Sequence, residues 1–151
     1  MQPVDCYTVN ALGYVAETEE GKCLTFLPQY IPALKGLSEF SHCQVLWWLH
    51  EFSDDMYRRT TRTTPPYEAP ECGVFATRSP VRPNPIGLSV VSILSVDETA
   101  GVVCVDGLDA YPGTPVLDIK AYFPSTDRVQ EVRVPEYARG WGEWVSFARR
   151  E

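Results

Sequence analysis

The stretch IGLSVVSILSVDETAGVVCVD, residues 86–106, decides the fold class of this 151-residue chain. Ile86 to Asp97 is rich in Val, Ile and Ser, a composition typical of a long β-strand. Gly101 to Asp106 is a second β-branched run, and Glu98 to Ala100 between the two has the length of a hairpin turn. We therefore expect an antiparallel pair of strands here and a protein built mainly from β-sheet.

Short strand-like segments flank this pair on both sides. Cys43 to Glu51, CQVLWWLHE, is predicted to be a buried strand because of its length and its Val, Trp and Leu content. The other predicted strands are Val4 to Val9, Leu12 to Ala16, Lys22 to Leu27 and Val116 to Tyr122. One C-terminal helix is predicted, Trp141 to Arg150, in which Trp144 and Val145 share a face with Ala148. Many short strands and few helices predict a mainly β, single-domain barrel over residues 1–151.

Charge limits the function classes that fit the chain. The formal net charge of −7 argues against a protein that coats nucleic acid, because such binding needs a broad basic field. Five arginines nevertheless lie between Met56 and Arg82, against two glutamates. This local basic patch fits an enzyme that binds one part of a polyanion. The alternative interpretation is a solvated loop with ordinary surface arginines.

The cysteines and the N-terminal sequence indicate in which cellular compartment the protein works. Five scattered cysteines, with no C-x-x-C pair, predict reduced thiols in a cytoplasmic protein. With two histidines and this cysteine spacing, we expect no metal site. The opening MQPVDCYTVN has neither a basic start nor an apolar run, so we expect no secretory signal. The longest apolar candidate, Val45 to Leu49, has the length of a strand and not of a membrane span.

The segment GVFATRSPVRPNPIGL, Gly73 to Leu88, is the candidate functional centre. Its R-P-N-P run fixes φ at two prolines and biases Arg82 and Asn84 toward extended geometry. Such a stiff scaffold loses little entropy when a ligand binds. The forks of Arg78 and Arg82 match carboxylates and phosphates. A Pro-rich connector with solvent-facing arginines is the alternative interpretation.

This motif resembles the defining segment of the TrmO/TsaA-like (YaeB-like) family. The further matching segments are LGYV (Leu12 to Val15), LKGLSEFSHCQVLWWLH (Leu34 to His50) and GLDAYPGTPVLDIKAYFP (Gly107 to Pro124). The resemblance implies a β-barrel homodimer that uses S-adenosyl-L-methionine to methylate N6 of threonylcarbamoyladenosine, at position 37 next to the tRNA anticodon. It also implies a cofactor site near the subunit interface. The partners implied are therefore the tRNA anticodon loop and a second copy of the chain.

The resemblance also assigns roles to single residues. Those that align with cofactor-binding positions are His50, Glu51, Arg78, Leu88, Pro112, Gly113, Thr114 and Pro115. Asp118 and Lys120 match the D-x-K of the following strand. The family usually carries a P-R-Q element after its first strand, and here Ala16 to Tyr30 lacks it.

The proposed chemistry selects further candidates. Methyl transfer to a weakly basic ureido nitrogen needs a base, for which His50 and Asp118 are the candidates. Arg82 and Asn84 are predicted to face the substrate and complete the catalytic set. The residues predicted to contact tRNA are Arg58, Arg59, Arg62, Arg82 and Lys120. Two other functions stay open: a methyltransferase on a different RNA or small molecule, and a non-catalytic cofactor-binding dimer.

Overall fold

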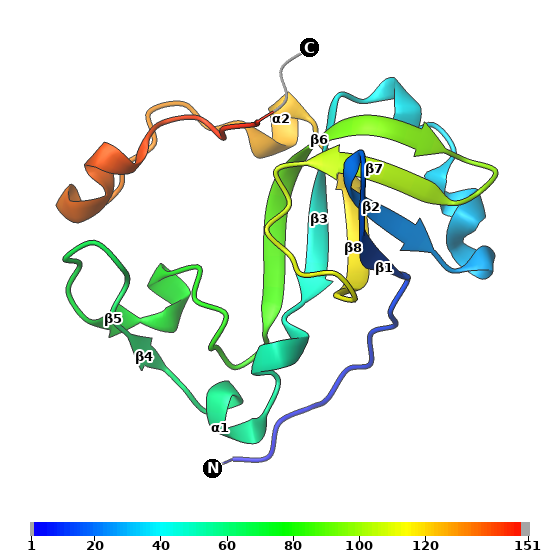
Figure 1. The fold of residues 1–151 in the computed structure, drawn as a ribbon. Coiled ribbons are helices and arrows are strands. Elements are labelled where there is room, and N and C mark those ends of the chain that lie inside the picture. The colour runs from blue at the N-terminus through cyan, green and yellow to red at the C-terminus, as the bar shows by residue number, and fades with distance from the viewer. Residues whose placement is uncertain (1, 149–151) are drawn as a thin grey trace.

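The protein forms a closed six-stranded antiparallel barrel, with strand order β1-β2-β7-β6-β3-β8 (Figure 1). The computed structural model describes residues 2–148. The barrel strands are β1 (Gly13–Thr18), β2 (Gly21–Phe26), β3 (His42–Trp48), β6 (Ile86–Asp97), β7 (Val102–Asp106) and β8 (Pro115–Ala121). A separate two-stranded sheet pairs β4 (Arg62–Thr63) with β5 (Cys72–Gly73). The prediction of a mainly β barrel is confirmed.

The helical segments are all short. They are α1 (Asp55–Arg58), α2 (Pro124–Asp127) and the 3₁₀ helices η1 (Pro28–Leu34), η2 (Leu37–Glu39), η3 (His50–Phe52), η4 (Val74–Ala76) and η5 (Glu136–Trp141). Within residues 2–148, no helix has the length and apolar character needed to cross a membrane.

Valine and leucine side chains fill the interior of the barrel. Val45, Val91 and Val103 are fully buried and pack with Leu24 and Val116 in one cluster. Burying one such side chain contributes about 1.5–3 kcal/mol, so this cluster is a main source of stability. Because side chains occupy the interior of so small a barrel, a ligand has to bind at its rim or outer wall.

The predicted hairpin is confirmed, and its strands are β6 and β7. Ser92 pairs with Asp106 and Asp97 pairs with Val102, with a register shift between Ile93 and Ser95. That irregularity lets the twelve-residue β6 bend, so that it pairs with β7 along one part and with β3 along the other.

Two predictions at the ends of the chain are wrong. Val4 to Val9 forms no strand; Val4 is 77% exposed and pairs with no neighbour in the sheet. Residues 142–148 are not helical, and the C-terminal helical segment is the earlier η5. The cause is local, because Gly142 has φ of 101° and stops helical continuation. Positions 149 and 150 of the predicted helix lie outside the described residues.

The prediction that all five cysteines are thiols is also wrong. Cys23 and Cys104 form a disulfide. They are register partners on the neighbouring strands β2 and β7, with Cα atoms 3.9 Å apart, although 81 positions separate them in sequence. Their spacing along the chain therefore gave no signal. Of the free cysteines, Cys43 is buried, and burial raises the pKa of its thiol to about 12.

The disulfide and the three free thiols predict how many cysteines react with an alkylating reagent. After mild oxidation and unfolding without reductant, three cysteines should react with an alkylating reagent, and all five should react after reduction. In the folded protein, Cys6 and Cys72 should react and Cys43 should not. The closed loop is long, so reduction should lower Tm by roughly 5–15 °C, which corresponds to about 2–4 kcal/mol. Five reactive thiols in the oxidised, unfolded protein would contradict the disulfide.

Candidate functional site

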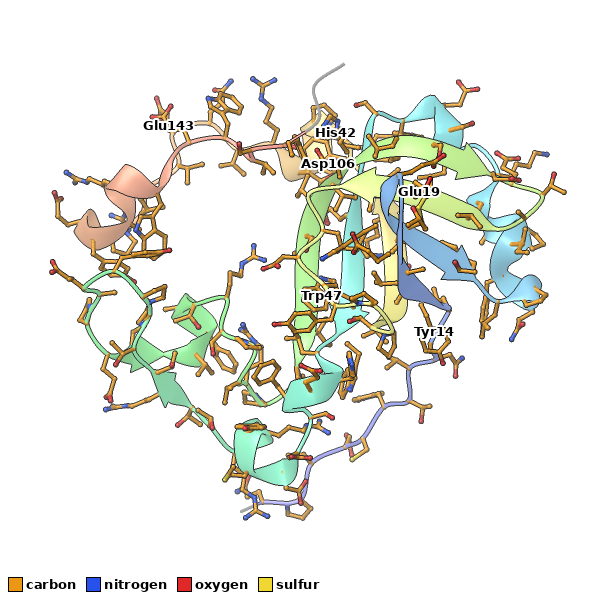
Figure 2. The ribbon with its side chains drawn as sticks, viewed as in Figure 1. Tyr14, Glu19, His42, Trp47, Asp106 and Glu143 are labelled. Carbon is orange, nitrogen blue, oxygen red and sulfur yellow. A yellow bond between two sulfur atoms is a disulfide. The ribbon has the colours of Figure 1, made fainter. Side chains whose placement is uncertain are left out.

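One pocket of about 680 Å³ lies at the rim of the barrel, where β3 ends and β6 begins. Its lining comes from the end of β3, from η3 and η4, from the Gly73 to Leu88 motif and from the β7–β8 loop. Trp47, marked in Figure 2, belongs to this lining. The volume lies in the range that small-molecule and cofactor sites occupy.

The pocket wall depends on a contact between Trp47 and Gly87. These two residues are opposite each other in the β3–β6 ladder. A Cβ atom placed on Gly87 would overlap the Trp47 indole, so only glycine lets the ring lie flat against β6. The indole Nε1 donates to Ser89 Oγ at 3.2 Å. The glycine of the motif thus sets the position of the large aromatic side chain in the pocket.

The arginine-containing loop is held to the barrel by its own hydrogen bonds. The half-buried Arg82 donates from Nη1 to the Thr77 and Ser79 carbonyls, both at 3.2 Å, and from Nη2 to the Val74 carbonyl at 3.4 Å. Arg78 Nη1 donates to the Leu88 carbonyl at 3.2 Å. The motif is therefore a fixed structural unit, which disfavours its interpretation as a solvent-facing connector.

The β7–β8 loop closes the other side of the pocket and is anchored to β1. Gly113 N donates to the Val15 carbonyl at 2.7 Å, and Val15 N donates to the Thr114 carbonyl at 2.9 Å. Gly113 has φ of 85°, which a side-chain-bearing residue adopts only with strain. This turn buries Thr114 at the pocket and leaves Tyr111 exposed at its edge.

The structure brings about half of the predicted site residues together. Those that line the pocket are His50, Glu51, Arg78, Arg82, Asn84, Leu88 and Thr114. The predicted residues outside its lining are Arg58, Arg59, Arg62, Pro112, Gly113, Pro115, Asp118 and Lys120. Two of these pair with each other, Lys120 Nζ and Asp118 Oδ2 at 3.0 Å. In addition, Arg62 Nη1 pairs with Glu71 Oε1 at 3.3 Å.

Sequence reasoning did not select several residues of the pocket lining, and three of them add groups that a ligand could contact. Phe75 is 83% exposed and Tyr111 64% exposed, although both are large and apolar in body. Asp109 adds a second carboxylate beside Glu51. Their positions in the sequence could have indicated them. Phe75 lies inside the arginine motif, and Asp109 and Tyr111 lie in the segment just before Gly113. An exposed aromatic within such a motif indicates contact with a ligand more often than core packing.

The chemistry of the lining defines what can bind. Apolar surface from Trp47, Leu88 and Phe75 faces two guanidinium groups and two carboxylates. Such a pocket accepts a ligand that carries a flat ring, an ammonium group and a carboxylate. S-adenosyl-L-methionine has these groups, so the residues present fit it. None of the lining residues comes from Ala16 to Tyr30, within the described part of the chain.

Comparisons with known proteins place the chain in one family. The tRNA-methyltransferase O N-terminal domain matches residues 13–128. A protein of Methanothermobacter thermautotrophicus, named a probable S-adenosyl-L-methionine-binding protein, is 43% identical over 110 residues, which cover 73% of this chain and 74% of that protein. The crystal structure of TrmO from Pseudomonas aeruginosa is 32% identical with a TM-score of 0.66 and covers 85% of this chain.

The fold and the pocket thus define a TrmO-type β-barrel protein. This chain belongs to the family of the tRNA-methyltransferase O N-terminal domain. A tRNA (adenine(37)-N6)-methyltransferase of Mus musculus is 40% identical over 102 residues, which cover 68% of this chain. Several relatives are longer: the chain spans 61% of the Pseudomonas aeruginosa structure, 23% of the mouse protein and 30% of an Archaeoglobus fulgidus protein.

The contact between Trp47 and Gly87 yields a stability prediction. Gly87→Ala should destabilise the protein by about 1–3 kcal/mol, because the indole has to leave its position against β6. Urea unfolding measures the loss, and tryptophan fluorescence reports the displaced ring. Gly73→Ala is the matched control, since its Cβ would meet only Thr61 O at 3.8 Å. Equal stability of the two variants would show that Gly87 is not required for this packing.

Proposed function

We propose that this chain is an S-adenosyl-L-methionine-dependent methyltransferase that modifies N6 of threonylcarbamoyladenosine at position 37 of tRNA. The observation that carries the proposal is the pocket in which His50, Arg78 and Asn84 meet at the end of β3. Support also comes from the printed names of the relatives, which include S-adenosyl-L-methionine-binding proteins and a tRNA (adenine(37)-N6)-methyltransferase.

The cofactor would be held by the pocket residues that the family resemblance selects. Arg78 would supply a guanidinium to its carboxylate, and Glu51 would accept hydrogen bonds from its ammonium or hydroxyl groups. Leu88 and the buried Thr114 complete the wall. When bound, S-adenosyl-L-methionine supplies an electrophilic methyl group next to a sulfonium centre.

His50 is the better placed of the two candidate bases. It lies in η3 and lines the pocket, whereas Asp118 lies outside the lining and holds Lys120. An imidazole nitrogen of His50 would accept the N6 proton of the ureido group while the new N–C bond forms and the bond from the methyl carbon to the sulfonium sulfur breaks, so that S-adenosyl-L-homocysteine leaves. General base catalysis of this kind contributes about 10²–10⁴-fold to a rate.

The tRNA backbone would be contacted outside the pocket. Arg59 and Arg62 belong to the polar segment between β3 and β5 and are exposed. The carboxylate of the threonylcarbamoyl group would approach the motif near Arg82, whose Nη donors are already engaged by backbone carbonyls. Lys120 lies on β8 in an ion pair with Asp118, and it would reach phosphate only at the expense of that pair.

An assay with labelled cofactor tests the function directly. Label should transfer from S-adenosyl-L-methionine to tRNA that carries the threonylcarbamoyl group and not to the same tRNA without it. His50→Gln should lower kcat about 10²-fold or more. Transfer to another RNA or a small molecule would replace the proposed substrate. Cofactor binding with no transfer to any acceptor would indicate a non-catalytic binding protein.

We also propose that two copies of the chain associate. Residues 128–148 follow α2 as an arm, drawn in orange and red in Figure 1, which extends away from the barrel to η5 and returns to it at Phe147, whose ring centre lies 5.1 Å from that of His42. The arm exposes large apolar side chains: Val129 by 69%, Val132 by 67%, Trp141 by 53% and Trp144 by 76%. An apolar surface of this kind is covered by a partner in most proteins, and the family resemblance favours a second copy.

Light scattering coupled to size exclusion tests this association. The wild-type protein should elute with twice the 17.0 kDa mass of one chain. Exchange of Trp141 and Trp144 for serine should shift the population toward the monomer, because both side chains are exposed in one copy. Tyr7→Ser, which removes an 87% exposed aromatic far from the arm in sequence, is the matched control. A monomeric wild-type protein at 100 micromolar, roughly the range of weak dimers, would refute the association.

Action on tRNA would place the protein in the cytoplasm.

A further inference from the structure

Arg58 directs its guanidinium at the arginine motif and not at solvent. Its Nε donates to the Pro83 carbonyl at 2.8 Å, and its Nη2 donates to Asn84 Oδ1 at 3.1 Å. The guanidinium carbon lies 5.7 Å from the ring centre of Trp48, within the range of a cation–π contact. Three separate contacts thus fix one exposed side chain.

These contacts join three segments at the pocket. Arg58 is the last residue of α1, Trp48 is the last residue of β3, and Asn84 lies in the R-P-N-P run. Trp48 pairs with Ile86, which is the first residue of β6. Arg58 therefore closes the gap between the end of one strand and the loop that leads into the other.

The contact with Arg58 also decides which way the Asn84 amide faces. A guanidinium has only donors, so the oxygen of the amide has to point toward it. The Nδ2 group of Asn84 then points away from Arg58, and within residues 2–148 no protein acceptor for it is found. Asn84 lines the pocket, so two N–H donors are available to a ligand there.

We propose that Arg58 is a positioning residue that orients Asn84, so that Asn84 donates hydrogen bonds to an acceptor oxygen of the bound substrate. A carbamoyl carbonyl next to the methylated nitrogen is an acceptor of this chemical class. A donor on that oxygen stabilises the negative charge that develops when N6 loses its proton. The identity of the acceptor rests on the proposed function, whereas the orientation of Asn84 does not.

This role differs from phosphate binding, which the sequence predicted for Arg58 together with Arg59 and Arg62. A phosphate contact needs positive charge, and lysine supplies it as well as arginine. The contact with Pro83 and Asn84 needs two donors in a fixed fork, which lysine lacks. Arg58→Lys therefore separates the two roles.

The kinetic experiment compares Arg58→Lys and Arg58→Gln on threonylcarbamoyl-modified tRNA. Both variants should lower kcat about tenfold or more, within the 10²-fold that a misplacement of 1 Å can cost, while KM for tRNA changes little. The salt slope of tRNA binding should stay at the wild-type value in both. Lys35→Gln removes one charge from the exposed loop between η1 and η2, outside the pocket lining, and serves as the control. It should leave kcat unchanged.

Asn84→Asp supplies the second variant. It keeps an oxygen acceptor for Arg58 and removes both donors, so it should lower kcat as much as Arg58→Lys. The double variant should be no slower than Asn84→Asp alone, because both changes interrupt one interaction. Fully additive losses would overturn the proposal.

A measurement on the free protein makes the result independent of activity. The Arg58 Nε–H and the Asn84 side-chain amide should give separate ¹⁵N resonances, and Arg58→Lys should shift the Asn84 amide pair. If the wild-type protein methylates no tRNA, the proposed function fails while this readout still tests the orientation of Asn84. An unshifted Asn84 amide overturns the proposal. A wild-type value of kcat in Arg58→Lys also overturns the proposal. A salt slope of tRNA binding that falls by about 0.7–0.9 in Arg58→Gln alone overturns it as well, because it would indicate a phosphate contact.

Discussion

The pairing of β3 with β6 is the constraint on which the rest of the structure depends. It places Trp48 opposite Ile86 and Trp47 opposite Gly87, and a hydrogen bond of 2.7 Å from Leu49 N to the Pro85 carbonyl extends the ladder beyond both strands. A slip of one residue would turn every side chain of β6 to the opposite face. Since the arginine motif runs directly into β6, this register also fixes where the motif lies.

The position of the pocket follows from the same constraint. The barrel interior is filled mainly by valines and leucines, so a ligand cannot enter it, and the pocket lies at the rim where β3 ends. Two loops at that rim are anchored by backbone hydrogen bonds: the motif through the Pro85 carbonyl, and the β7–β8 loop through Gly113 and Thr114. Residues far apart in sequence can then be held in one geometry, which a catalytic site requires.

The sequence predicted those features that depend on local pattern. The β6–β7 hairpin follows from β-branched runs on both sides of a short turn, and the Gly73 to Leu88 segment, selected by its composition together with the family resemblance, contributes residues to the pocket lining. The predictions from sequence failed where the structure depends on contacts between segments that are distant along the chain. The strand predicted at Val4 to Val9 has a suitable composition but no neighbour to pair with. The disulfide of Cys23 with Cys104 exists only because β2 and β7 are adjacent in the closed barrel.

The arginines around the pocket show the same limit of prediction from local sequence pattern. As a pattern, five arginines in one region indicate a basic patch for phosphates. In the structure, Arg82 holds backbone carbonyls of its own loop, Arg78 reaches the Leu88 carbonyl from within the pocket, and Arg58 is directed at Pro83 and Asn84. Arg59 and Arg62 are exposed, and Arg62 carries an ion pair with Glu71. Most of the positive charge in this region is therefore engaged in fixing the loops around the pocket, and a charge count alone overstates how much of it is available for phosphates.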